Sequence, residues 1–261
     1  MSKNTLETTV YGEPTAKPPL LVVHGLFGSG RNWGVLSKRL AADRQVVAVD
    51  MRNHGNSFWD HGNSYFDMAD DLARTIAGIG GRASVLGHSM GGKASMVLAL
   101  TKPDYIENLI VADIAPIPYT HAPQENITAM RAVDLSAVQR RGDADLQLQE
   151  FVEDPSQRAF LLQSLSLKDN TASWKLNLDA LEAAMPDIVG FPEMTGQFER
   201  PTLFLHGGAS DYVLPEHTPK IREHFPRSEF EAIEGAGHWL HAEKPREFLS
   251  SVDAFLHSND A

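Results

Sequence analysis

The residues with the clearest chemical potential are Gly87-His88-Ser89-Met90-Gly91, which form a G-x-S-x-G motif. The motif follows the apolar run Ser84–Leu86 and precedes the helix-forming run Lys93–Leu100. A serine between a strand and a helix is typical of a nucleophile elbow, where flanking glycines leave room for a tight turn. The dipoles of the following helix favour negative charge on the serine oxygen. The motif therefore predicts acyl transfer with Ser89 as the nucleophile.

A serine hydroxyl is a weak nucleophile near neutral pH and needs a general base. His238 is the strongest candidate, because it follows the last expected strand within Gly235-Ala236-Gly237-His238-Trp239. In sites built on this motif the nucleophile comes first along the chain and the histidine comes last. His217 precedes that strand and His241 lies in the next turn, so both fit this order less well.

The base in turn needs a carboxylate that orients its ring and stabilises its charged form. Asp211 follows the apolar run Thr202–Leu205, in the turn that usually carries this acid. Asp113 ends the run Leu109–Ala112, which is expected to form the strand beside the nucleophile strand. Both strand ends would face His238, so residue type and spacing leave the choice between the two aspartates open.

Acyl transfer also needs hydrogen-bond donors for the oxygen of the tetrahedral intermediate. One expected donor is the backbone amide of Met90, directly after the nucleophile. The second should come from the glycine-rich loop that follows the apolar run Leu20–Val23. We assign it to the amide of Leu26, with the amide of Phe27 as the alternative.

The elements that must position these residues alternate between strands and helices. Four short apolar runs, typical of strands buried on both faces, occur at Leu20–Val23, Val46–Val49, Ser84–Leu86 and Leu109–Ala112. Further strands are expected at Thr5–Tyr11, Thr202–Leu205 and Glu229–Ile233. Helical spacing of apolar residues predicts helices over Asn32–Ala42, Tyr65–Ile79, Gly91–Leu100 and Phe248–Leu256. This order predicts an α/β fold with a mostly parallel central sheet flanked by helices.

Residues 117–198 differ from the rest, because they contain helical patterns and no convincing strand. Helices are expected over Ile127–Val133, Leu146–Val152, Gln157–Leu165 and Trp174–Met185. We expect these residues to form a helical cap over a core made of residues 1–116 and 199–261. Within the cap, Leu161, Leu162 and Trp174 are expected to line the substrate pocket.

The composition of the 261 residues is that of an ordinary globular protein, with 42% hydrophobic and 22% charged residues. A formal net charge of -11 disfavours nucleic acids and anionic membrane surfaces as partners. The absence of cysteine excludes disulfides, thiolate metal sites and a cysteine nucleophile. The first residues do not resemble a signal peptide, and no apolar run is long enough to span a membrane. The expected location is the cytoplasm.

Five segments of the chain, HGLFG, VDMRNHGNS, LGHSMGGKASM, ADIAP and GAGHWLHAEKP, are more specific than the general motif. Together they resemble the YbfF-type esterases of the α/β-hydrolase superfamily and their eukaryotic relatives, the abhydrolase-domain-containing protein 11 group. The resemblance runs from about Leu20 to Phe255 and weakens across the cap. It implies an α/β-hydrolase fold, short-chain carboxylesterase activity, a small helical cap and no metal or organic cofactor.

The resemblance also bears on the acid. It favours Asp113, which matches the family within Asp113-Ile114-Ala115-Pro116, and it implies an auxiliary hydrogen-bonding role for Ser210 near His238. The family does not usually carry an aspartate at the position of Asp211, so this residue is a departure and stays the alternative acid.

We therefore expect a serine carboxylesterase that hydrolyses short-chain acyl esters through an acyl-enzyme intermediate, with a small-molecule ester as its partner. The same residues would also suit a thioesterase or a perhydrolase, because a fold does not determine the substrate. A third alternative, from a different class, is a ligand receptor that keeps a hydrolase pocket. Turnover of a simple ester separates an enzyme from a receptor, while the oligomeric state is left open by the sequence.

Overall fold

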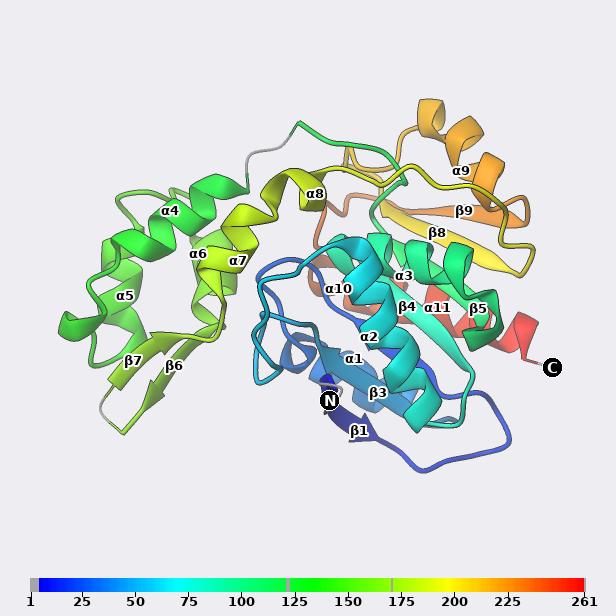
Figure 1. The fold of residues 1–261 in the computed structure, drawn as a ribbon, viewed down its shortest axis with the longest axis horizontal. Helices are drawn as coiled ribbons and strands as arrows, with labels where there is room; N and C mark the ends of the chain where they lie inside the picture. Colours follow the sequence, from blue (N-terminus) through cyan, green and yellow to red (C-terminus); the bar gives the residue numbers. More distant parts are fainter. Residues whose placement is uncertain (1–4, 121–122, 170, 261) are drawn as a thin grey trace.

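The computed structural model describes residues 5–120, 123–169 and 171–260. At its centre is a seven-stranded sheet with the order β1-β3-β2-β4-β5-β8-β9 (Figure 1). The strands are β1 (Glu7–Tyr11), β2 (Leu20–Val23), β3 (Val46–Asp50), β4 (Ala83–His88), β5 (Ile106–Ala112), β8 (Thr202–Gly207) and β9 (Ser228–Ile233). All neighbouring pairs are parallel except β1 and β3, so the mostly parallel α/β sheet predicted from the sequence is confirmed.

Helices cover both faces of the sheet. In β2, Leu21 and Val23 pack into one apolar cluster, whereas Leu20 and Val22 pack into the other. Burial on both faces explains why the strand sequences are continuous apolar runs rather than alternating patterns. One face carries α2 (Tyr65–Gly78), α3 (Met90–Thr101) and α9 (Thr218–His224), and the other carries α1 (Gly34–Leu40), α10 (Leu240–Glu243) and α11 (Pro245–Asn259).

Between β5 and β8 the chain leaves the sheet and forms a separate group of elements, which we call the cap (Figure 1). Its elements are α4 (Gln124–Ala132), α5 (Arg141–Leu148), α6 (Pro155–Leu162), β6 (Leu165–Lys168), β7 (Thr171–Trp174), α7 (Leu178–Ala183) and α8 (Met185–Val189). Short 3-10 helices at Gly30–Trp33, Pro103–Tyr105, Leu135–Ala137 and Pro215–His217 complete the described elements.

The expectation that the cap contains no strand was wrong, because β6 and β7 pair as an antiparallel hairpin. Leu165 and Trp174 face each other in this pair and are buried, while Lys168 and Thr171 beside the turn are exposed. Each strand has only four residues, too few for a periodicity of two to stand out from the helical patterns on either side.

The cap is hydrogen-bonded to the core at several separated places, including a bond from Asn32 Nδ2 to Gln163 Oε1 beside α6 and two places where the acceptors are backbone carbonyls. At the first, the backbone amide of Gly55 donates to Lys175 O at 2.8 Å and that of Asn177 donates to Asn53 O at 3.0 Å. At the second, Tyr65 Oη donates to Ile188 O at 2.7 Å near the end of α8. The cap is therefore held over the carboxyl ends of the sheet strands by contacts on several sides.

Candidate active site

Three side chains from different loops form one hydrogen-bonded row at the carboxyl ends of β4, β5 and β9. The distance from Ser89 Oγ to His238 Nε2 is 3.1 Å, and the distance from His238 Nδ1 to Asp113 Oδ2 is 2.7 Å. The aspartate is fully buried, whereas the histidine side chain is 21% exposed. This is the arrangement that lets a histidine remove the proton from a serine while a carboxylate holds the ring.

The backbone around Ser89 has the strained form expected of a nucleophile elbow. Ser89 has φ 52° and ψ -119°, in a region that non-glycine residues rarely adopt, and it forms the N-cap of α3. The neighbouring chains approach so closely that a Cβ on Gly91 would lie 2.4 Å from His24 O, and one on Gly87 would lie 2.5 Å from Gly91 O. Glycines are therefore required at both positions, and the hydroxyl lies at a helix N-terminus.

Of the two aspartates considered for the acid, the structure brings only Asp113 to His238. Its carboxylate also accepts hydrogen bonds from the backbone amide of Gly207 at 2.9 Å and from Ser210 Oγ at 2.6 Å. Asp113 has φ 51°, a left-handed conformation at the end of β5. Asp211 is exposed, although it follows Ser210 directly in the sequence. Ser210 thus lies on the carboxylate, where an auxiliary group is expected.

The ring of His238 is held from several sides. Tyr212 stacks on it with the ring centroids 4.0 Å apart and the planes inclined by 22°. His88 Nε2 donates to the backbone carbonyl of His238 at 2.9 Å, and this bond fixes the His88 proton on Nε2. Burial lowers the pKa of His88 well below its ordinary value, so it stays neutral beside His238. Tyr212 has no part in the sequence motifs, which is why sequence reasoning missed it.

The two residues whose backbone amides are predicted to bind the oxyanion both lie beside Ser89. Leu26 and Met90 line the same small pocket as Ser89, and Met90 is the first residue of α3, where amides lack helical acceptors. The amide of Phe27, the alternative considered from the sequence, donates to His54 Nε2 at 3.2 Å. Its hydrogen is therefore already in use, and the geometry favours the amide of Leu26 over that of Phe27.

Two buried imidazoles hold the loop that carries Leu26. His24 Nε2 accepts from the amide of Met51 at 2.9 Å, so its Nδ1 proton is free to donate to Gly25 O at 2.8 Å. His54 likewise donates from Nδ1 to Arg52 O at 2.8 Å while Nε2 accepts from the loop. Burial lowers the pKa of His24 to about 4 and that of His54 to about 3. Both rings are neutral near pH 7, each with a tautomer set by backbone groups.

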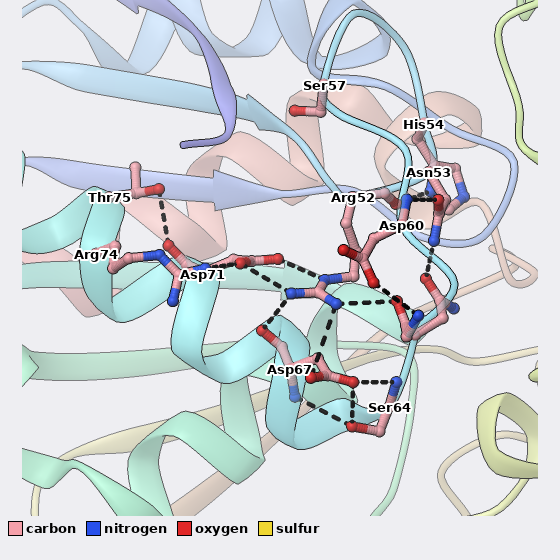
Figure 2. Close-up of polar contacts among 12 residues, drawn as sticks. Arg52, Asn53, His54, Ser57, Asp60, Ser64, Asp67, Asp71, Arg74 and Thr75 are labelled. Carbon is pink, nitrogen blue, oxygen red and sulfur yellow. Dashed lines mark hydrogen bonds and ion pairs between the residues drawn. The ribbon is translucent and has the colours of Figure 1, made fainter. Parts of the chain in front are cut away.

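The segment that carries His54 is anchored by a buried ion pair. Figure 2 shows Arg52 reaching α2, where its Nε and Nη2 donate to the two oxygens of Asp71 at 2.6 and 3.0 Å. Arg52 Nη1 also donates to Gly62 O at 2.9 Å. Asn53, with φ 64°, donates through Nδ2 to Asn63 Oδ1 at 2.9 Å. Removing one partner of such a buried pair typically costs about 3–5 kcal/mol, so this segment is a rigid support for the loop.

A cavity of about 340 Å³ opens beside Ser89 and His238, between the sheet edge and the cap. We call it the central cavity. Leu161 of α6 lines it together with Phe160, Trp239 and His241. The other two predicted pocket residues are not among its described lining residues, so the prediction was wrong for Leu162 and Trp174. Both are buried in the cap, and the indole of Trp174 donates to Met130 O at 2.9 Å.

Ser89 also lines a much smaller space of about 50 Å³, which shares Leu26, Pro123 and Tyr212 with the wall of the central cavity and which we call the small pocket. Lys93 of α3 lines it, and its amine donates to Val189 O at 2.9 Å and also to Gly190 O, at the end of α8. Burial lowers the pKa of Lys93 to about 7, and its amine also lies 4.8 Å from the centre of the Tyr119 ring. Lys93 therefore joins α3 to the cap at the edge of this pocket.

The part of the chain that the structure describes contains no group of three or more His, Asp or Glu side chains placed to hold a metal ion together. It also contains no helix with the length and hydropathy needed to cross a membrane.

The fold and the site together define a class of protein. A family model described as the alpha/beta hydrolase fold matches residues 18–245. The chain belongs to the α/β-hydrolase family.

Similar proteins narrow this description further. The mouse (Mus musculus) sn-1-specific diacylglycerol lipase ABHD11 is 41% identical over 248 residues, covering 92% of this chain and 81% of the relative. Esterase YbfF of Escherichia coli (strain K12) is 38% identical over 240 residues, covering 91% and 92% of the two chains. A solved structure of a marine microorganism esterase superposes with a TM-score of 0.92 at 35% identity, covering 97% of this chain and all of that one. These findings confirm the resemblance seen in the sequence, and the chain is a hydrolase of the esterase and lipase type.

Proposed function

We propose that the protein is a serine carboxylesterase that hydrolyses short-chain acyl esters through an acyl-enzyme intermediate. Ser89 Oγ attacks the ester carbonyl carbon while His238 Nε2 removes its proton. The oxygen of the tetrahedral intermediate receives hydrogen bonds from the amides of Leu26 and Met90. His238 then gives its proton to the leaving alcohol, and Asp113 stabilises the charged imidazole in between. Water, activated by His238, releases the acid and restores Ser89.

The observation that carries this proposal is the unbroken row from Ser89 through His238 to Asp113, with distances of 3.1 and 2.7 Å. A pocket that only binds a ligand has no need for a strained serine aligned with an imidazole and a buried carboxylate. The row includes no second nucleophile, so serine chemistry is the reaction that these groups support.

The size of the small pocket supports a short acyl chain. It has a volume of about 50 Å³ and is lined by Leu26 and Met90, whose amides are the donors we propose. One water-sized group needs roughly 10–15 Å³ by the same measure, so about four such groups fit. A longer acyl chain would have to displace buried side chains such as Ile114 or Tyr65, which is costly in a packed interior.

The test is turnover of p-nitrophenyl esters of increasing acyl length, with a thioester run in parallel. We expect rapid hydrolysis of the acetyl and butyryl esters, a steep decline with longer chains, and no turnover by Ser89→Ala. A thioester cleaved much faster than the matching oxygen ester would favour a thioesterase instead. A folded protein that binds these esters without hydrolysing any of them would refute the proposal.

A further inference from the structure

We propose that the alcohol half of the substrate is its larger half and that it extends from the central cavity into a groove between α6 and α1. This groove favours uncharged or cationic groups over anionic ones. This inference rests on the proposed function and names the kind of ester that the site takes.

The direction of the substrate follows from the position of the base. His238 must give its proton to the leaving oxygen, so the alcohol has to lie on the side of Ser89 where His238 is found. The central cavity is lined by both Ser89 and His238. The small pocket is lined by Ser89, Leu26 and Met90, and His238 is not among its described lining residues. The acyl chain therefore points into the small pocket and the alcohol into the central cavity.

Next to the central cavity lies a second space of about 730 Å³, which we call the outer groove. The two spaces share four wall residues, namely Asn32, Phe160, Trp239 and His241. Beyond them the outer groove runs along α6 at Ala159 and along α1 at Val35, whose side chain is 75% exposed. We infer that an alcohol that fills the central cavity extends past these shared residues into the outer groove, whose wall has apolar side chains on both α6 and α1.

The charges of the outer groove are of one sign. Among its described lining residues the charged groups are Asp154 and Glu243, and no lysine or arginine is present. Both side chains are exposed, and each uses one oxygen in a backbone hydrogen bond, Asp154 to the amide of Ser156 and Glu243 to that of Gly237. Their remaining oxygens can attract a cation and repel an anion at the far end of the alcohol.

The orientation is tested with two isomers, hexyl acetate and ethyl hexanoate, which have the same atoms and nearly the same hydrophobicity. We expect kcat/KM to be at least about tenfold higher for hexyl acetate, because a six-carbon alcohol chain fits the groove whereas a six-carbon acyl chain is too long for the small pocket. A preference for ethyl hexanoate would place the acyl chain in the groove and overturn the proposal.

The charge preference is tested with acetyl esters of six-carbon alcohols that end in a trimethylammonium, a methyl or a carboxylate group. We expect the cationic ester to exceed the anionic one about tenfold in kcat/KM at low ionic strength, and the ratio to shrink as salt is added. Asp154→Asn should lower this ratio about threefold, since asparagine is an equally good N-cap residue and the helix start is kept. Equal rates for the three esters would overturn the charge assignment.

The matched control is Asp134→Asn. Asp134 is also an exposed cap residue whose side chain accepts from a backbone amide two residues later, but it does not line the outer groove. This variant should leave the ratio unchanged, and an equal effect of both variants would show that only net charge matters and refute the groove. Hydrolysis of p-nitrophenyl acetate is measured for the unaltered protein and both variants, to separate the proposed esterase function from the proposed role of the groove. No hydrolysis by the unaltered protein would count against the esterase function. Normal hydrolysis without any charge preference would count against the groove alone.

Discussion

Replacing Asp113 with asparagine changes one atom of the acid and should disable the base. The backbone amide of Gly207 can still donate to the remaining oxygen, as it does now at 2.9 Å. The new amide nitrogen would take the place of Oδ2, which lies 2.7 Å from His238 Nδ1. Because this nitrogen carries hydrogens, His238 would have to accept at Nδ1 and carry its proton on Nε2. That tautomer cannot remove the proton of Ser89.

The expected loss in kcat is on the order of 10⁴, which corresponds to about 5 kcal/mol of barrier height. The assay is steady-state hydrolysis of p-nitrophenyl acetate, with thermal unfolding measured on the same preparation to show that the variant is folded. Asp211→Asn is the matched control, because Asp211 is exposed and its replacement should alter kcat by no more than about twofold. A folded Asp113→Asn enzyme with nearly normal activity, or a folded and inactive Asp211→Asn enzyme, would refute the assignment of the acid.

Two further predictions concern the close packing of the backbone around Gly91 and the buried imidazoles of His24 and His54. Gly91→Ala should abolish activity and lower the melting temperature, because the added Cβ would lie 2.5 Å from Val23 O. Its control, Gly78→Ala, adds a Cβ in open space and should be neutral or stabilise the protein by up to about 1 kcal/mol. Equal melting temperatures of the two variants would contradict this prediction. Since the folded-state pKa values of His24 and His54, about 4 and 3, lie below their ordinary value of 6.5, their contribution to stability is complete above about pH 6.5 and declines as the pH falls. Denaturant unfolding should show a loss of about 2 kcal/mol per ring between about pH 7 and pH 5, and a free energy that is constant across this range would be evidence against neutral rings.

The strands, their helices and the elbow could be predicted because each depends on a local pattern. A run such as Val46–Val49 is buried on both faces, and glycines flank Ser89 because the turn leaves no space for a Cβ. The choice of acid could not be predicted from residue types, since Asp113 and Asp211 both follow strands. It depends on the left-handed backbone at Asp113 and on the direction of its side chain, which the family resemblance anticipated and the local sequence did not.

Other features depend on contacts between distant segments, which no local pattern records. The amide of Phe27 is excluded as a donor by His54, a residue of the next strand's loop. The pocket role expected of Leu162 and Trp174 fails because their apolar side chains pack inside the cap, whereas their neighbour Leu161 reaches the central cavity. An apolar residue of the cap suits either place equally well, and only the packing of α6 against the core decides between them.

The central claim, that Ser89 becomes covalently acylated during turnover, is tested most directly by intact-protein and peptide mass spectrometry after inhibition with diethyl p-nitrophenyl phosphate. We predict the addition of one diethylphosphoryl group per chain, located on the peptide that contains Ser89, with activity lost in proportion to labelling. Ser89→Ala should remain unlabelled under the same conditions. A fully labelled protein that keeps its esterase activity, or one whose inactivating label lies on another residue, would contradict the account.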